Sequence, residues 1–236
     1  ITDLAIMLSD GITVPAYTTY VEKDYDYILN DCTPSIIFVS NNEQYNKLKN
    51  IIYDKKFIKK IFSFEKLDNV EIDYINYEDL IQNNNAKNSL IHKSSALRKD
   101  PSCIIYTSGT QGNPKGVMLS HGGILNNCEG AIDILKPLLS KEQPRFLTWL
   151  PLSHSYEHTV QFVQITVAAR IFYAESIDKL VKNMGDCSPE IMTAVPRFYQ
   201  NLYQKINASF KKSTGLKKKL IFKMLELGLK KIKKEN

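Results

Sequence analysis

The chain alternates between short β-rich runs and helical patterns, and this alternation narrows its possible folds more than any other feature. The β-rich runs are SIIFVS at 35–40, CIIYTS at 103–108, RFLTWL at 145–150, RIFYA at 170–174 and IMTAV at 191–195. Helical patterns fill most of the intervals, around residues 22–30, 43–53, 120–135, 155–169, 176–183 and 197–208. Several runs are apolar throughout, as expected of strands that helices cover on both faces. The sequence therefore predicts an α/β fold with mixed, largely parallel sheets flanked by helices on both faces.

The polar run QNNNAKNS at 82–89 is typical of a linker or surface loop. With 236 residues, 43% of them hydrophobic, the chain can bury a core in one large domain or two small ones. We expect residues 1–99 to form a first α/β subdomain and residues 100–236 to form a second subdomain.

Cysteine usage and hydropathy indicate a cytoplasmic protein. Cys32, Cys103, Cys128 and Cys187 form no C-x-x-C pair, which predicts four reduced, buried thiols. No secretory signal is visible, and no stretch is apolar over the 18 or so residues that span a bilayer.

The most informative segment is IIYTSGTQGNPKGVMLSH, residues 104–121. In it, an apolar strand leads into glycines that admit close backbone approach, hydroxyls that donate hydrogen bonds, and a lysine. These residues are Thr107, Ser108, Gly109, Thr110, Gln111, Gly112 and Lys115. The segment is not a Walker A loop, because Pro114 stands where the second glycine of that motif belongs. It predicts a polyphosphate-binding loop that joins a strand to a helical pattern beginning at Ser120.

The run YTSGTQGNPKG resembles the signature of the adenylate-forming enzymes, which include acyl-CoA synthetases, peptide-synthetase adenylation domains and luciferases. Their loop usually reads Y-T-S-G-T-T-G-x-P-K-G, so Gln111 is the one departure. The resemblance implies that the phosphates of ATP bind at residues 107–112 and Lys115. It also makes the Thr107 hydroxyl a candidate Mg²⁺ ligand.

Further stretches resemble the long-chain fatty acid–CoA ligase branch of that family. They are DLAIMLSDGITVPAY at 3–17, LPLSHSYEH at 150–158, SPEIMTAVPRFYQNLYQKI at 188–206 and the lysine-rich GLKKKLIFKMLELGLK at 215–230. The resemblance implies that a fatty carboxylate attacks the α-phosphate of ATP to give an acyl-adenylate and pyrophosphate. CoA, the co-substrate, then displaces AMP to give acyl-CoA.

The family's later motifs, which contact adenine and ribose and form the hinge, are not found in the 236 residues. We therefore expect a chain truncated at both ends, with its first subdomain incomplete at the N-terminus and its second incomplete at the C-terminus. We expect little or no ligase turnover from this polypeptide alone. The alternative is a non-catalytic remnant that binds nucleotide at most.

His154, Glu157 and His158 spell H-x-x-E-H, a pattern that in zinc metallopeptidases places two histidines one helical turn apart. Pro151 and Ser153 place His154 at the first turn of a helix, so the two histidines can also be capping or core residues. The family resemblance implies a third role. It places His154 beside the reacting carboxylate as a catalytic orienting group and makes Glu157 and His158 substrate-binding residues.

The net charge of +6 is concentrated in residues 205–236, where eleven lysines face two glutamates, and the rest of the chain sums to −3. This segregation argues against a nucleic-acid partner. The basic segment is imperfectly amphipathic. Either it packs on its own enzyme with a solvated lysine face, or residues 211–234 make peripheral contact with an anionic membrane. The sequence carries no signal for oligomeric state.

Overall fold

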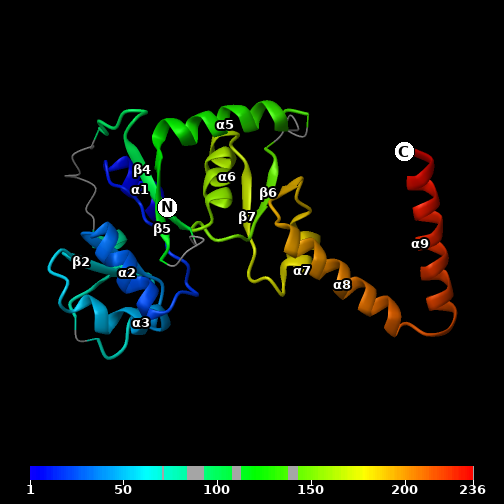
Figure 1. Cartoon of the computed structure of the whole chain (residues 1–236), viewed down its shortest axis with the longest axis horizontal. Helices are drawn as coiled ribbons and strands as arrows, with labels where there is room; N and C mark the ends of the chain where they lie inside the picture. The colour runs from blue at the N-terminus through cyan, green and yellow to red at the C-terminus, as the bar shows by residue number, and fades with distance from the viewer. Residues whose placement is uncertain (71, 84–92, 108–112, 138–142, 236) are drawn as a thin grey trace. The chain divides into compact units, whose positions relative to one another are not determined.

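A computed structural model describes residues 1–70, 72–83, 93–107, 113–137 and 143–235 (Figure 1). Its backbone contacts group the chain into two compact units, Ile1–Ile191 and Met192–Asn236. The predicted α/β fold, with parallel sheets flanked by helices, is confirmed. The predicted division into subdomains at residues 99 and 100 stays a prediction.

The first sheet is parallel, with the order β1-β2-β3. Its strands are β1 (Ile36–Val39), β2 (Lys60–Ser63) and β3 (Ile75–Asn76), and the helices around it are α2 (Glu22–Cys32), α3 (Asn42–Ile52) and α4 (Tyr77–Asn83). The first helix of the chain, α1 (Thr2–Leu8), contributes Met7 to a different core. On one face, Ile37, Val39 and Ile61 are buried in a core with side chains of α2 and α3. On the other face, Phe38 and Phe62 stack with their ring centroids 4.9 Å apart.

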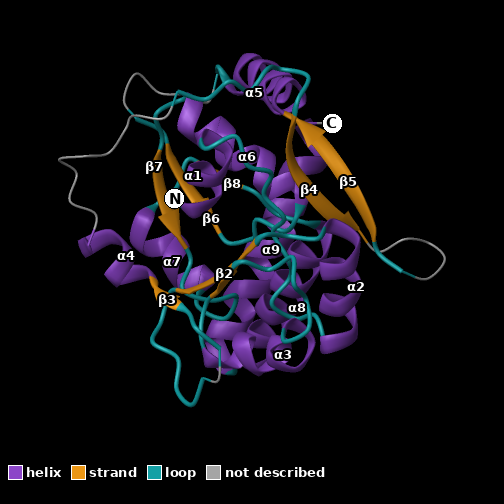
Figure 2. Cartoon of the chain, turned by 90° about the vertical axis from the view of Figure 1, so that its left-hand side faces the viewer, coloured by secondary structure: helices purple, strands orange, loops and turns teal. Residues whose placement is uncertain are grey.

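The second sheet is an antiparallel hairpin of β4 (Pro101–Thr107) and β5 (Lys115–Ser120), whose strands run side by side in Figure 2. The third sheet has the order β7-β6-β8. Its elements and the adjoining helices are β6 (Arg145–Thr148), β7 (Arg170–Tyr173), β8 (Ile191–Met192), α5 (His121–Leu135), α6 (Ser155–Thr166) and α7 (Leu180–Cys187). Helices α5 and α6 pack on each other. They share a second core, made of Met7, Cys103, Ile105, Ile124, Cys128 and Val163.

Local capping explains where several helices begin. The Asn41 side chain accepts a hydrogen bond from the backbone N–H of Gln44 at 3.1 Å and so caps α3. Ser120 caps α5 in the same way through the N–H of Gly123. Each cap satisfies a backbone donor that has no partner inside its own helix.

Several sequence expectations need correction. Residues 115–120 form a strand, so the phosphate-loop segment joins two strands rather than a strand and a helix. The helix expected at 176–183 lies at Leu180–Cys187, and the strand expected at 191–195 covers only two residues. The polar run at 82–89 begins inside α4, and its residues 84–89 lie outside the described part. All four cysteines are free; Cys103 and Cys128 are buried, but Cys32 and Cys187 are only half-buried.

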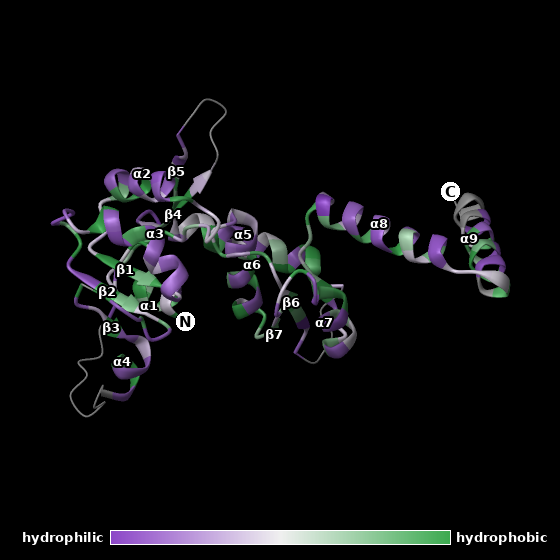
Figure 3. Cartoon of the chain, turned by 90° about the horizontal axis from the view of Figure 1, so that it is seen from below, coloured by the Kyte–Doolittle hydropathy of each residue, from purple (hydrophilic) through white to green (hydrophobic). Residues whose placement is uncertain are grey.

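The second unit contains α8 (Pro196–Lys212) and α9 (Gly215–Glu235). Proline at the first helical position suits α8, because its missing N–H would have no intrahelical partner there. Gly215 adopts a φ of 60° at the start of α9, a conformation that glycine takes without strain. Both helices mix hydrophobic and hydrophilic residues along their length (Figure 3). No helix in the described ranges combines the length and the apolar character that a membrane span requires.

Candidate functional site

Thr107 and Lys115 stand opposite each other at the loop end of the β4–β5 hairpin. β4 is buried through Ile105 and Tyr106 and emerges at Thr107, which is exposed, as is Lys115. Antiparallel pairing therefore brings the hydroxyl-bearing and the cationic residue to one solvent-facing end of the hairpin. The other predicted loop residues, Ser108, Gly109, Thr110, Gln111 and Gly112, lie outside the described residues.

His154 occupies the N-cap of α6, with extended backbone angles and a half-buried side chain. Its Nδ1 accepts a hydrogen bond from the backbone N–H of Tyr156 at 3.3 Å, and its carbonyl accepts the first helical bond, from His158, at 3.0 Å. The predicted position of His154 at the start of a helix is confirmed. Its Nε2 side is free of this capping bond, so the ring can serve a second partner through that nitrogen.

His158 lies one turn further along α6 and is 1% exposed. Its Nε2 is 3.1 Å from the Oδ2 atom of Asp3 in α1, and its ring stacks on Phe162 at a centroid distance of 5.6 Å. Burial raises the pKa of Asp3, but the hydrogen bond and charge of His158 outweigh it, so the pKa lies below its usual value. Glu157, the neighbouring residue, is fully buried.

A largely apolar cavity of about 380 Å³ adjoins this helix start. Leu152, two residues before His154, lines it, as does Asp3, the partner of His158. Most of the remaining lining comes from α1, residues 12–18, α2 and β1. The segment LPLSHSYEH therefore borders an apolar space at one end and enters the core at the other.

The geometry does not support the metallopeptidase interpretation. His154 uses Nδ1 to cap a helix, and the Nε2 atom of His158 is occupied by Asp3. Within the described ranges, no three His, Cys, Asp or Glu side chains lie close enough to hold a metal ion together. The capping and core interpretation matches the positions of both histidines.

The predicted site residues fall into two sets that different elements hold. The hairpin pairs Thr107 with Lys115, whereas α6 carries His154, Glu157 and His158. The sequence interpretation missed Asp3, because its contact with His158 spans 155 positions and no local pattern announces it.

The sequence profile of the AMP-binding enzyme family matches residues 1–228 of the chain. Among curated proteins, the long-chain-fatty-acid–CoA ligase ACSBG2 of Rattus norvegicus is 29% identical over 96% of the chain and 36% of its own length. Long chain acyl-CoA synthetase 3 of Arabidopsis thaliana is 27% identical over 88% of the chain and 32% of its own length. The chain thus spans about a third of the length of these relatives.

Solved structures of similar fold include an anthranilate CoA ligase in complex with anthranoyl-AMP. It superposes with a TM-score of 0.72 at 19% identity, over 84% of this chain and 38% of its own. A long-chain-fatty-acid–CoA ligase from Archaeoglobus fulgidus superposes with a TM-score of 0.68 at 22% identity, over 88% of this chain and 39% of its own.

Proposed function

Because the chain belongs to the AMP-binding enzyme family, we propose that its β4–β5 hairpin binds the phosphates of ATP. We further propose that this binding serves the activation of a long-chain fatty acid to acyl-adenylate and then to acyl-CoA. The named relatives support the choice of substrate. The observation that carries the proposal is the exposed Thr107–Lys115 pair, which flanks a run of glycines and hydroxyls.

The proposed chemistry requires cationic stabilisation. A carboxylate that attacks the α-phosphate of ATP brings two anions together, and pyrophosphate leaves with further negative charge. Lys115 would supply a positive charge, while the Thr107 hydroxyl would donate a hydrogen bond. We assign Ser108, Gly109, Thr110, Gln111 and Gly112 to the same phosphate-binding loop from the sequence motif.

Mg²⁺ fits this site as a companion of ATP. Mg²⁺ prefers oxygen ligands and takes several of them from substrate phosphates and water. The Thr107 hydroxyl, exposed at the hairpin end, would be its protein ligand. When bound, Mg²⁺ would supply charge neutralisation on the phosphates.

We assign the fatty acid to the side of the site that α6 borders. His154 would orient the reacting carboxylate through its Nε2 atom, because its Nδ1 is already used in the cap. Glu157 and His158 are buried, so in their proposed substrate-binding role they would support the residues that line the cavity rather than touch the ligand themselves. The apolar cavity beside Leu152 is consistent with an acyl ligand near this wall.

Isothermal titration calorimetry of the 236-residue chain with Mg²⁺–ATP tests nucleotide binding. We expect one site, weakened on the order of tenfold by Lys115→Ala, because a charge-assisted hydrogen bond is lost. Lys136→Ala is the matched control, since Lys136 is an exposed lysine at the end of α5. The proposal fails if the folded chain gives no saturable heat, or if the two variants bind equally well.

A stable acyl-adenylate mimic tests the acyl side with the same chain. His154→Ala should weaken binding of the mimic more than binding of ATP, because only the mimic carries the acyl carbonyl. Equal effects on both ligands would remove His154 from the acyl site.

A second candidate is nucleotide binding without turnover. Fatty-acid-dependent release of pyrophosphate from ATP separates the two candidates. The ligase function predicts release well above a Lys115→Ala background, whereas the non-catalytic candidate predicts ATP binding with release no higher than that background. Release well above that background would refute the non-catalytic candidate.

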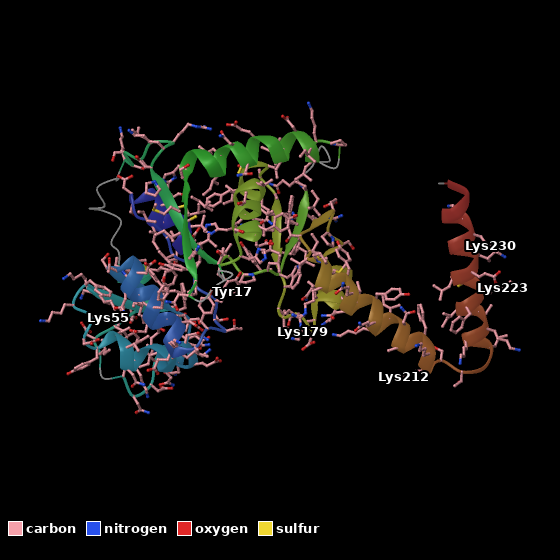
Figure 4. All side chains as sticks on the ribbon, viewed as in Figure 1. Tyr17, Lys55, Lys179, Lys212, Lys223 and Lys230 are labelled. Atoms are coloured by element: carbon pink, nitrogen blue, oxygen red, sulfur yellow. The ribbon has the colours of Figure 1, made fainter. Side chains whose placement is uncertain are left out.

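We also propose that residues 211–234 contact an anionic membrane surface. Lys219, Lys223 and Lys230 are spaced so that they share one side of α9, and the exposed apolar side chains Leu216, Leu220, Met224 and Leu227 form an adjoining stripe. Figure 4 labels two of these lysines, Lys223 and Lys230. The charge of this segment suits a surface of anionic lipid headgroups.

Co-sedimentation with anionic and with neutral vesicles tests this contact. Replacing Lys219, Lys223 and Lys230 with Glu should abolish binding to anionic vesicles. The charge-matched control replaces three exposed lysines of the first unit, Lys66, Lys99 and Lys136, with Glu. Binding that is indifferent to salt and lipid charge, or is lost equally in both variants, would contradict the proposal.

A further inference from the structure

Tyr106 directly precedes the proposed phosphate loop and is bonded to a distant helix. It is the last buried residue of β4, with 3% exposure. Its hydroxyl donates a hydrogen bond to the Oδ2 atom of Asp31 at 2.6 Å, across 75 positions of sequence. Asp31 lies in the last turn of α2. One side-chain contact therefore ties the end of the strand that leads to Thr107 to a helix of the first sheet.

The hairpin leaves room for the Tyr106 ring by placing a glycine opposite it. Gly116 is the register partner of Tyr106. A Cβ atom at that position would lie 3.1 Å from the Cζ atom of Tyr106 and 3.0 Å from Cγ2 of Ile104. Contacts this short would force the ring or the strand to move. The absence of a side chain at Gly116 thus lets the ring lie against β5 while its hydroxyl reaches Asp31.

The hydroxyl remains a donor over the whole working pH range. Burial, followed by the hydrogen bond to Asp31, raises the pKa of Tyr106 far above its usual value. A hydrogen bond from a neutral phenol to a carboxylate is charge-assisted and stronger than one between neutral groups. The hydrogen bond between Tyr106 and Asp31 is therefore strong, and Tyr106 is always its donor.

From this geometry we infer that Tyr106 and Asp31 are positioning residues for phosphate binding. Thr107 follows Tyr106 in β4, and Lys115 precedes Gly116, the register partner of Tyr106, in β5. Tyr106 and Gly116 are therefore each one residue away from a proposed phosphate contact. The Tyr106–Asp31 hydrogen bond fixes the end of β4. It thereby fixes the positions of the Thr107 hydroxyl and the Lys115 ammonium group. A site held in this way loses less entropy when the phosphates bind. The inference rests on the nucleotide-binding function proposed above.

Isothermal titration calorimetry with Mg²⁺–ATP on variants of Tyr106 and Asp31 tests the inference. Tyr106→Phe and Asp31→Leu should each weaken ATP affinity about five- to tenfold, because the loop ends are no longer fixed. Asp31→Asn should retain most of the affinity, because its amide oxygen still accepts the bond. Thermal unfolding of every variant is measured in parallel.

Tyr25→Phe is the matched control. Tyr25 is a buried tyrosine of α2, the helix that carries Asp31. Its hydroxyl donates a hydrogen bond to the carbonyl of Tyr17 at 2.8 Å and not to a residue of β4. This variant should lose comparable stability and keep its ATP affinity within about twofold. If Tyr106→Phe fails to fold, Gly116→Ala on the exposed strand β5 disturbs the same ring and should weaken ATP binding.

The outcomes separate the two proposals. If the unaltered chain does not bind ATP, both the proposed function and the positioning role fall. If it binds ATP and the affinity of Tyr106→Phe matches that of Tyr25→Phe, only the positioning role is refuted. An Asp31→Asn variant as weak as Asp31→Leu would also refute it, since the hydrogen bond would then not be the cause.

Discussion

The contact between Asp3 and His158 joins α1 to α6 and offers a direct test of what holds the first unit together. Its Nε2–Oδ2 distance is 3.1 Å, the His158 side chain is 1% exposed and the Asp3 side chain is 18% exposed. Asp3→Ala leaves the ring nitrogen of His158, a side chain that is only 1% exposed, without its acceptor. The cost is therefore the lost bond together with an unpaired buried polar group.

Hydrogen bonds to charged groups contribute about 1.5–3 kcal/mol net, and an unsatisfied buried partner adds to the loss. Since His158 is almost fully buried, we expect Asp3→Ala to lower the free energy of unfolding by about 2–3 kcal/mol. Asp3→Asn keeps an acceptor oxygen and should lose only about 1 kcal/mol.

The effect must also depend on pH in one direction. The pKa of Asp3 is lowered in the folded protein, because the hydrogen bond and charge of His158 outweigh the opposing effect of burial. A carboxyl group with a lowered folded pKa stabilises the fold above its unfolded pKa of about 3.9 and loses that contribution as the pH falls through the folded value. The difference between the unaltered chain and Asp3→Asn should therefore be present at neutral pH and shrink in acid.

Urea unfolding, followed by the fluorescence of the single tryptophan, Trp149, measures these changes. A double-mutant cycle with His158→Phe, which preserves an aromatic ring beside Phe162, isolates the interaction. We expect a coupling free energy of about 1 kcal/mol or more. Additivity within about 0.5 kcal/mol, or a loss that persists unchanged into acid, would refute the reasoning.

Three further predictions concern single contacts. Gly122→Ala should destabilise α5 by about 1–3 kcal/mol, because its Cβ would lie 2.7 Å from a backbone carbonyl oxygen. Gly130→Ala in the same helix meets no atom within 4 Å and should stabilise the helix by up to about 1 kcal/mol. Thermal unfolding compares the two variants. Burial raises the pKa of Cys103 to about 11, so alkylation at neutral pH should need urea, and rapid labelling of the native chain would contradict this. Hydrogen bonds from Arg145 lower the pKa of Glu190, so Glu190→Gln should lower the urea midpoint at neutral pH, and a difference that does not shrink in acid would rule this out.

The sequence predicted those strands that carry their own apolar signal. β1, β4, β6 and β7 each contain consecutive apolar residues, such as IIFV in β1, and such runs favour strands in a covered sheet. β2 and β3 were missed, because β2 has only two apolar residues, Ile61 and Phe62, and β3 is only two residues long. Both strands owe their character to pairing with a neighbour. β5 was missed for a different reason. Its residues are mostly exposed, and the glycine and lysine of the loop motif masked its pairing with β4.

The residues of the candidate site also differ in whether the sequence could predict them. The loop motif identified Thr107 and Lys115, and a nearby proline with a serine predicted that His154 begins a helix. Asp31 and Asp3 could not be predicted, because each meets its partner only through tertiary packing, across 75 and 155 positions of sequence. A single sequence names the groups that carry a motif, whereas the groups that hold them in place emerge only from the fold.

The hairpin changes how the proposed phosphate site must work. A loop that led directly into a helix could use the positive end of that helix, but α5 begins only after the six residues of β5, about 20 Å along an extended strand. The first three N–H groups of α5 already donate to the carbonyls of Asp100 and Arg98 and to the Ser120 hydroxyl. Since a helix dipole acts mainly within its first turn, α5 contributes little to phosphate binding. In the proposed site the positive charge therefore comes from Lys115 rather than from α5, which is why the position of the hairpin end matters.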